Sequence, residues 1–162
     1  MDTIQLLGCG YAHPATHVSN HELEKTIDTS DEWIVQRTGI HARYVAVNET
    51  TSMLAAGVDK ADIRLLIVAT LTADQPMPST ACLVQERMGM MDQPIMAFDL
   101  NAACSGFLYA LQCACAMLKE EEYALVIGAE NLSKIIDWKD RGTCILFGDG
   151  AGAAVIRKSA NG

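Results

Sequence analysis

Residues 97–107 read AFDLNAACSGF, a pattern that passes from strand to turn to helix. Residues 97–100 predict a β-strand, residues 101–103 a turn, and Cys104 the first turn of a helix. The helix is indicated by apolar residues at spacings of three and four, namely Leu108, Leu111, Cys115 and Leu118. Because its surface is apolar almost all round, we expect this helix to be deeply buried.

Outward from this stretch, short apolar runs alternate with helical patterns, which is typical of an α/β protein with a buried parallel sheet. Ser19 or Asn20 can cap one helix, and Thr29 with Glu32 forms a capping-box pattern for the next. A further helix is expected over residues 79–89. We expect β-strands at residues 4–8, 65–70, 95–100, 124–128, 144–147 and 151–157.

The bulk composition excludes some classes of function. The chain has 162 residues, enough for one domain or one half of a larger one, and residues 1–162 show no internal domain boundary. The net charge of -8 argues against a nucleic-acid partner, which requires a basic surface. The first residues carry no basic targeting region, and no apolar run is long enough to span a membrane. We therefore expect a cytoplasmic protein without a membrane partner.

The cysteines lie mostly in apolar or small-residue segments, at Cys9, Cys82, Cys104, Cys113, Cys115 and Cys144. In a cytoplasmic protein we expect these thiols to be reduced, without disulfides. Cys113 and Cys115 are closer together than the usual metal-binding pair, and no second pair follows. They are expected to be small buried side chains, and we expect no metal site.

Cys104 is the candidate nucleophile. At the start of a helix, the unsatisfied N–H groups and the positive end of the helix dipole both favour a thiolate. Its neighbours are small, so an acyl group can approach the sulfur and backbone amides can face an oxyanion. By position alone a structural role stays open, and it is the commoner role for a cysteine at a helix start.

Four motifs resemble, in order and spacing, those of the type III 3-oxoacyl-(acyl-carrier-protein) synthases, a family of thiolase-fold enzymes. They are DLNAACSGF at 99–107 (nucleophile motif), SDEWI at 30–34 with RTGI at 37–40 (coenzyme A segment), GAE at 128–130 with Ser133 (core strand), and FGDGAGA at 147–153 (glycine loop). The resemblance covers nearly the whole chain. It implies an α/β fold that forms the N-terminal, nucleophile-bearing half of the layered α-β-α-β-α thiolase fold.

This resemblance implies an acyltransferase of the initiation of fatty-acid biosynthesis. In that family the cysteine, here Cys104, takes an acyl group, usually acetyl, from acyl-coenzyme A and condenses it with malonyl-(acyl-carrier-protein), releasing carbon dioxide. A thiolate suits this task because it attacks a thioester readily and leaves readily. Acyl-coenzyme A is thus implied as a substrate, no bound cofactor is expected, and the implied protein partners are the acyl carrier protein and a second copy or a complementary C-terminal chain.

The same resemblance implies substrate-binding roles. Trp33 would stack on the adenine ring, Arg37 and Arg141 would meet the nucleotide end of coenzyme A, and Thr38 belongs to the same segment. The planar guanidinium group of arginine can both stack on a base and pair with phosphate. Met77 falls where family members carry a residue that crosses a dimer interface to line the partner's acyl pocket. Without the resemblance, these residues are an ordinary helix aromatic, solvated surface charges and a flexible loop hydrophobe.

The glycine-rich residues 148–152 are followed by an apolar strand pattern and not by a helix, so they do not fit a dinucleotide-binding loop. We expect these glycines to permit close backbone packing and sharp turns beneath the active site.

Two family features are missing from the sequence. The histidine and asparagine that stabilise the thioester enolate belong to the family's second half. We expect the histidines at 13, 17, 21 and 41 to be surface or structural residues. Residues 51–55 stand where family members carry a full helix, a loss of roughly ten residues or about three turns. We expect this loss to expose apolar surface on the strand at 65–69, at a cost of several kcal/mol if nothing else fills the place.

Two alternatives remain open. One is a related thiolase-fold condensing enzyme, such as a hydroxymethylglutaryl-coenzyme A synthase or a polyketide synthase, although Trp33 and Arg37 favour the type III synthase. The other is a noncatalytic remnant that associates with a complementary thiolase-fold chain.

Overall fold

The computed structural model describes residues 3–49, 51 and 63–159. Its main sheet has five strands in the order β1 (Thr3–Ala12), β7 (Asp149–Ser159), β6 (Tyr123–Asn131), β4 (Ile63–Ala69) and β5 (Met96–Leu100). The strands β6, β4 and β5 are parallel, whereas β7 runs antiparallel to both of its neighbours. The carboxyl ends of the three parallel strands therefore meet at one edge, where α/β proteins place their sites.

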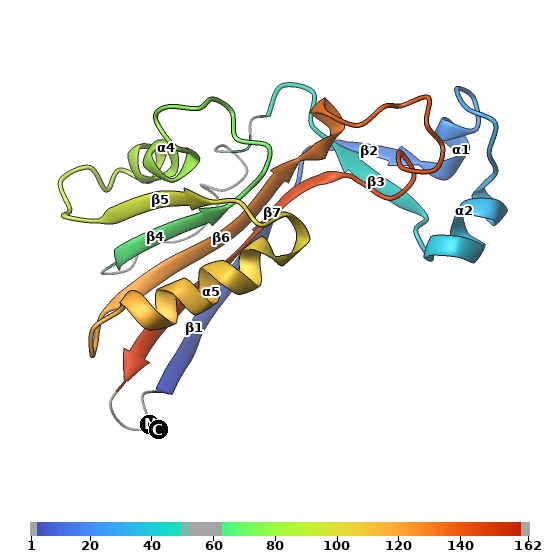
Figure 1. Ribbon diagram of the computed structural model, residues 1–162. Helices are drawn as coiled ribbons and strands as arrows, with labels where there is room; N and C mark the ends of the chain where they lie inside the picture. The colour runs from blue at the N-terminus through green and yellow to red at the C-terminus, as the bar shows by residue number, and fades with distance from the viewer. Residues whose placement is uncertain (1–2, 50, 52–62, 160–162) are drawn as a thin grey trace.

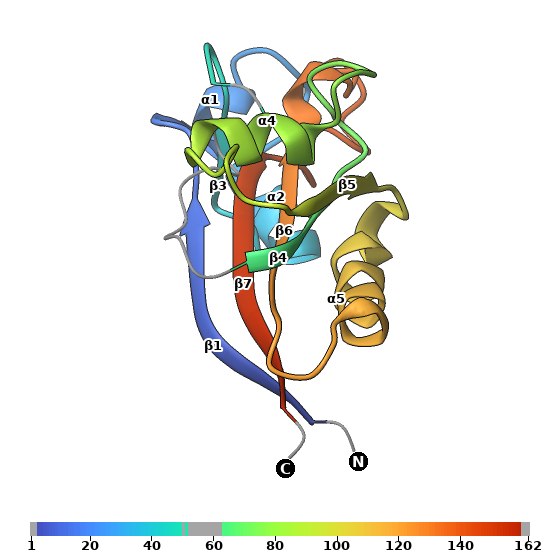
Figure 2. The same ribbon diagram turned by 90° about the vertical axis from the view of Figure 1, so that its left-hand side faces the viewer.

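Among the described residues, one helix covers each face of this sheet. Helix α4 (Thr80–Arg87) packs on one face and α5 (Gly106–Met117) on the other (Figures 1 and 2). The side chains of β4 alternate between them, because successive residues of a strand point to opposite faces. Leu66 and Val68 join the cluster under α4, while Leu65 and Ile67 join the cluster under α5.

Strand β4 corrects one sequence expectation. We expected apolar surface to be exposed over residues 65–69, but these five residues are at most 5% exposed. The strand lies between β6 and β5 and has α4 and α5 over its two faces, so its side chains are covered. The expected shortening at residues 51–55 lies, except for Thr51, outside the described residues.

A smaller layer adjoins the main sheet. Strands β2 (Thr16–Ser19) and β3 (Ala42–Val45) pair antiparallel, and neither strand was expected from the sequence pattern. Helices α1 (Asn20–Leu23) and α2 (Asp31–Thr38) lie in the connection between these two strands. Figure 1 shows the layer at the end of the molecule away from the two chain termini.

The strand expected at residues 144–147 is wrong. These residues lie in consecutive turns, closed by hydrogen bonds from Cys144 N to Asp140 O (2.9 Å) and from Leu146 N to Thr143 O (3.0 Å). Cys144 and Ile145 are nevertheless buried, in a third core cluster with residues of α1 and α2. An apolar run signals burial, and here turns rather than a strand provide it.

Helix α5 corrects the expectation of deep burial. Its buried residues are small and four apart, at Gly106, Ala110 and Ala114, while Leu108 is 66% exposed and Tyr109 57%. The small residues let the helix approach the sheet closely. A Cβ atom added at Gly106 would lie 3.3 Å from the Cβ atom of Ala69. One apolar face of α5 is therefore left at the surface of the described part of the chain.

Candidate active site

Cys104 lies in the short connection between the end of β5 and the start of α5. It sits in a short 3-10 helix, η1 (Ala103–Ser105), directly before the first residue of α5. Ala103 has a φ of +46°, in the left-handed region that costs a non-glycine residue about 1 kcal/mol or more. Its N–H donates to Asn101 Oδ1 at 3.3 Å, which holds this sharp turn. The strand-to-helix position expected for Cys104 is confirmed.

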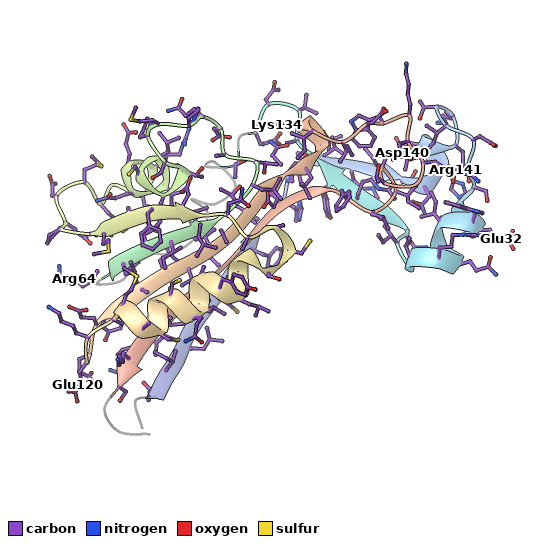
Figure 3. All side chains as sticks on the ribbon, in the orientation of Figure 1. Glu32, Arg64, Glu120, Lys134, Asp140 and Arg141 are labelled. Carbon is purple, nitrogen blue, oxygen red and sulfur yellow. The ribbon has the colours of Figure 1, made fainter. Side chains whose placement is uncertain are left out.

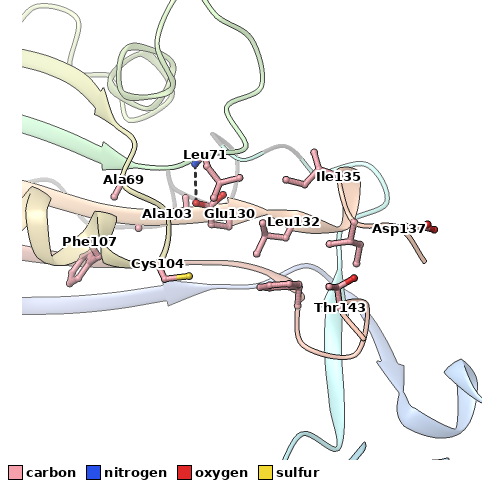
Figure 4. Close-up of a pocket in the computed structure, with 14 residues that line it drawn as sticks. Ala69, Leu71, Ala103, Cys104, Phe107, Glu130, Leu132, Ile135, Asp137 and Thr143 are labelled. Carbon is pink, nitrogen blue, oxygen red and sulfur yellow. Dashed lines mark hydrogen bonds between the residues drawn. The ribbon is translucent and has the colours of Figure 1, made fainter. Parts of the chain in front are cut away.

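A pocket of about 610 Å³ opens beside Cys104, and the sulfur points into it (Figure 4). The lining is mostly apolar and comes from the ends of β4 and β6, from α5 and from the loop before β7. It includes Ala69, Leu71, Phe107, Leu132, Ile135 and Phe147. Such a lining suits the hydrocarbon part of an acyl group.

The start of α5 differs from the other helix starts. Serine side chains accept hydrogen bonds at the N-termini of α1, α2 and α4, from Ser19, Ser30 and Ser79. For α2 this corrects the expected cap by one position, from Thr29 to Ser30. In the part of the chain that the structure describes, no side chain caps η1 or α5. The amides of Ala103, Ser105 and Gly106 donate to Asn101 Oδ1, Ala102 O and Ala103 O, which leaves the amide of Cys104 itself as the candidate donor to a ligand.

Glu130, near the end of β6, shapes the pocket from the other side. Its carboxylate accepts hydrogen bonds from Leu71 N (3.0 Å) and Thr70 Oγ1 (3.4 Å), and also from Thr72 Oγ1. These contacts hold the segment that follows β4, so that Leu71 lies against the pocket. Sequence reasoning placed Glu130 in a family motif but assigned it no role. A charged residue at the end of a buried strand was the available signal.

Trp33, Arg37 and Arg141 come together although Arg141 is far away in the sequence. The guanidinium carbon of Arg37 lies 4.3 Å from the centroid of the Trp33 ring, and that of Arg141 lies 4.6 Å from it. Both are cation–π distances. Arg141 also donates to Asp28 O at 2.7 Å, and Figure 3 shows it reaching over towards α2. We call these three residues the indole clamp.

The loop before β7 links the indole clamp to the Cys104 pocket. It carries Arg141 and also Thr143 and Phe147, which line the pocket. Its last residue before the strand, Gly148, lies against β3, where an added Cβ atom would be 3.0 Å from Tyr44 O. Asp149 accepts hydrogen bonds from Ala46 N at 2.6 Å and Ser133 N at 2.8 Å. The close packing expected of the glycine loop is confirmed at Gly148.

Two other residues expected to bind substrate lie apart from these contacts. The Thr38 hydroxyl donates to Ile34 O at 2.8 Å and accepts from Ile40 N at 3.0 Å, so both bonds close the end of α2. Met77 is 84% exposed in the loop before α4 and is not part of the Cys104 pocket.

The remaining chemistry-bearing residues form no second centre in the described ranges. All six cysteines are free, and Cys113 and Cys115 are half-buried. The histidines are exposed, as expected: His13 and His17 contact the Tyr44 ring, and His21 pairs with Glu24. Within residues 3–49, 51 and 63–159, no group of three or more His, Cys, Asp or Glu could hold a metal ion, and no helix is long and apolar enough to cross a membrane.

Comparisons with known proteins agree with this geometry. A protein-family model described as 3-Oxoacyl-[acyl-carrier-protein (ACP)] synthase III matches residues 98–162. A beta-ketoacyl-[acyl-carrier-protein] synthase III of Rhizorhabdus wittichii is 52% identical over 170 residues, which cover 97% of this chain and 53% of that protein. The matched stretch is longer than the 162 residues of this chain, so the relative carries residues within it that this chain lacks.

Solved structures extend the likeness to the fold. A crystal structure of 3-oxoacyl-[acyl-carrier-protein] synthase III from Aquifex aeolicus superposes with a TM-score of 0.92 at 44% identity, covering 98% of this chain and 55% of that one. The priming beta-ketosynthase of a polyketide biosynthetic pathway superposes with a TM-score of 0.87 at 36% identity, covering 96% and 50%. The α/β architecture is thus that of one half of the thiolase-like fold, as expected.

The chain spans about half the length of the curated relatives that it matches. Sequence identity, fold and the placement of the nucleophile motif agree, so the chain is a homologue of one half of the 3-oxoacyl-[acyl-carrier-protein] synthases III.

Proposed function

We propose that this chain supplies the acyl-accepting part of a 3-oxoacyl-(acyl-carrier-protein) synthase III, an acyltransferase that starts fatty-acid synthesis. The observation that carries the proposal is the position of Cys104. The residue lies at an uncapped helix start, and its sulfur faces an apolar pocket of about 610 Å³. Acetyl-coenzyme A is the proposed acyl donor, and no bound cofactor takes part.

The proposed first step is a thioester exchange. The Cys104 thiolate attacks the carbonyl carbon of the acyl-coenzyme A, a new carbon–sulfur bond forms, and the carbonyl oxygen becomes an oxyanion. The amide of Cys104, at the start of the helix, is the proposed donor to this oxyanion. The oxyanion then collapses, the bond to the coenzyme A sulfur breaks, and the coenzyme A thiolate leaves and takes up a proton.

The indole clamp is the proposed site for the nucleotide end of coenzyme A. An adenine ring can stack on the Trp33 indole, and Arg37 and Arg141 supply positive charge for phosphate. The loop from Arg141 to Phe147 connects this position with the pocket, so a single extended molecule can reach from one to the other. Thr38 supports the end of α2 in this scheme.

The second step, condensation with malonyl-(acyl-carrier-protein), needs groups that stabilise an enolate. The described histidines are exposed and lie outside the Cys104 pocket. We therefore propose that a complementary part of the synthase completes the site. Appreciable acetoacetyl product from these 162 residues alone would contradict this part of the proposal.

Exposed apolar residues favour association with a second chain, either another copy or a complementary C-terminal chain. They lie on β1 and α5 and include Leu6, Tyr11, Leu108 and Tyr109. Met77 is the proposed contribution to a partner's acyl pocket, since it is exposed beside α4. Light scattering during size exclusion tests this, and a sharp monomer peak with cooperative melting would argue against it.

Acyl transfer tests the function directly. The purified protein is incubated with acetyl-coenzyme A, and its cysteine-containing peptides are examined by mass spectrometry. We expect one acetyl group on the peptide that holds Cys104 and none after Cys104→Ala. The control is Cys9→Ala, which removes another exposed thiol and should leave labelling unchanged. Equal acetylation of Cys9 and Cys104 would rule out the proposed site.

A further inference from the structure

Arg43 of β3 is a buried cation that the acyl-transfer scheme does not use. Arg43 is only 5% exposed, yet no carboxylate in the described ranges forms an ion pair with it. Its Nε atom is buried without a hydrogen-bond partner in that part of the chain. A buried and incompletely partnered charge lowers stability, so an arginine at this position calls for another role.

The guanidinium group of Arg43 connects three segments. Its Nη2 atom donates to Asn20 Oδ1 at 2.8 Å and to Ile145 O at 3.3 Å, and its Nη1 atom donates to Val18 O at 3.4 Å. Val18 lies in β2, Asn20 begins α1, and Ile145 lies in the loop before β7. A planar fork can serve three such acceptors at once, which the single ammonium group of lysine does less well.

Asn20 carries the connection on to α2. This fully buried side chain donates from Nδ2 to Asp31 Oδ1 at 2.9 Å and to Ile40 O at 2.7 Å. Asp31 is the first residue of α2, and Ile40 follows its last turn. The amide of Asn20 thus holds both ends of the helix that carries Trp33 and Arg37.

Arg43 and Asn20 together join the two sides of the indole clamp. One side is α2, with Trp33 and Arg37, and the other is the loop that carries Arg141 and Ile145. Gly148 also lies close to Arg43: a Cβ atom added at Gly148 would be 3.1 Å from the Cβ atom of Arg43. Strand β3 therefore packs against the same loop. We infer that Arg43, acting through Asn20 and Ile145, is a positioning residue that sets the spacing of the indole clamp for the nucleotide end of coenzyme A.

This inference rests on the proposed function, and Arg43→Lys tests it. The variant keeps the positive charge but loses the planar guanidinium group, whose several N–H donors reach all three acceptors. We expect coenzyme A, titrated by calorimetry, to bind about tenfold more weakly, which is the effect of losing about one hydrogen bond. The rate at which iodoacetamide alkylates Cys104 should stay within about twofold of that of the unaltered protein. None of the residues to which Arg43 donates lines the pocket. The acetyl-coenzyme A concentration that half-saturates acetyl transfer should rise, with an unchanged rate at saturation.

Two further variants keep the test decisive. In Asn20→Asp the new carboxylate can still accept a hydrogen bond from Arg43, but the two hydrogen bonds from Nδ2 to Asp31 and Ile40 are lost and a second negative charge faces Asp31. This variant should therefore weaken coenzyme A binding, and it replaces Arg43→Lys if that variant does not fold. Arg157→Lys is the matched control, since Arg157 bonds Gln5 and Glu121 away from the clamp, and its affinity should be unchanged.

The outcomes separate the two proposals. If the unaltered protein binds no coenzyme A, the proposed function and the positioning role both fail. If it binds, and the folded Arg43→Lys and Asn20→Asp variants bind equally well, only the positioning role fails. A parallel fall in coenzyme A affinity and in the Cys104 alkylation rate would indicate general loosening of the fold and would also overturn the positioning role.

Discussion

Helices α4 and α5 both begin beside a cysteine, but the two beginnings are built differently. At α4, Ser79 accepts a hydrogen bond from Cys82 N at 3.3 Å, and the Asp99 carboxylate accepts from Thr80 N and Ala81 N at 2.7 Å each. The Ser79 hydroxyl also donates to the Cys82 sulfur at 3.2 Å. At α5 no described side chain caps the helix.

The difference separates a structural helix start from a reactive one. At α4 the positive end of the helix already faces a carboxylate, so little of its field is left for the Cys82 sulfur. At α5 the missing cap costs about 1 kcal/mol, and the left-handed Ala103 adds a similar amount. Stability is thus lower at the place where the amides and the thiol must remain available to a substrate.

The strongest contrast in thiol reactivity should be between Cys104 and the buried Cys144. Burial raises the pKa of the Cys144 thiol, and Asp140 and Asp137 act in the same direction, whereas Arg43 opposes them. At neutral pH a raised pKa means a smaller thiolate fraction, and a fully buried thiol reacts only when the structure opens. We expect iodoacetamide to label Cys144 at least about a hundredfold more slowly than Cys104.

The sign of the pH dependence follows from the same shift. Because the pKa of Cys144 is raised, its labelling should continue to increase to a higher pH than that of an unburied thiol. Peptide mapping of the alkylated protein across a pH series measures both thiols in one sample. Equal rates for Cys104 and Cys144 in a protein shown to be folded would contradict the assignment of Cys104.

The next effect compares Cys104 with Cys82. Cys82 is half-buried and its sulfur accepts a hydrogen bond from the Ser79 hydroxyl, whereas Cys104 is exposed at the uncapped start of η1 and α5. We expect Cys104 to be alkylated about tenfold faster. The same peptide maps give this ratio, and a Cys82 rate equal to that of Cys104 would show that the caps make no difference to reactivity.

Removing the carboxylate at α4 should make the two starts more alike. Asp99→Ala leaves Thr80 N and Ala81 N without their partner, and we expect the free energy of unfolding to fall by about 1–2 kcal/mol. Cys82 alkylation should also accelerate. Urea unfolding measures the stability, with Asp92→Ala as an exposed acidic control. An unchanged midpoint would mean that Asp99 does not stabilise α4.

The smallest effect concerns the backbone at Ala103. Glycine adopts a φ of +46° without a Cβ penalty, so Ala103→Gly should stabilise the fold by up to about 1 kcal/mol, less the added flexibility of the unfolded chain. Thermal melting measures the change. Ala116→Gly, on the exposed side of α5, should instead destabilise by about 1 kcal/mol, and a destabilisation of equal size at Ala103 would show that the turn is not strained.

Much of this architecture could be predicted from local patterns. The caps of α1 and α4, the strand before Cys104 and the helix after it follow from periodicity and hydrogen-bonding side chains within a few residues, whereas the cap of α2 was placed one residue too early. The same reasoning failed at residues 144–147, because an apolar run does not tell a strand from a buried turn. It also placed Leu108 inside, because a helix that is apolar all round gives no sign of which face the sheet will cover.

Local patterns were enough to predict the strand, turn and helix around Cys104, and four motifs carried the resemblance to the synthases. Those features depend on neighbouring residues, whose geometry is fixed by the backbone. No local pattern showed that Arg141 meets Trp33, that Asp99 caps α4, or that Arg43 ties α2 to a distant loop; these contacts follow from packing in three dimensions. These contacts join segments far apart in the chain, and their positions follow from how the helices and strands pack against one another.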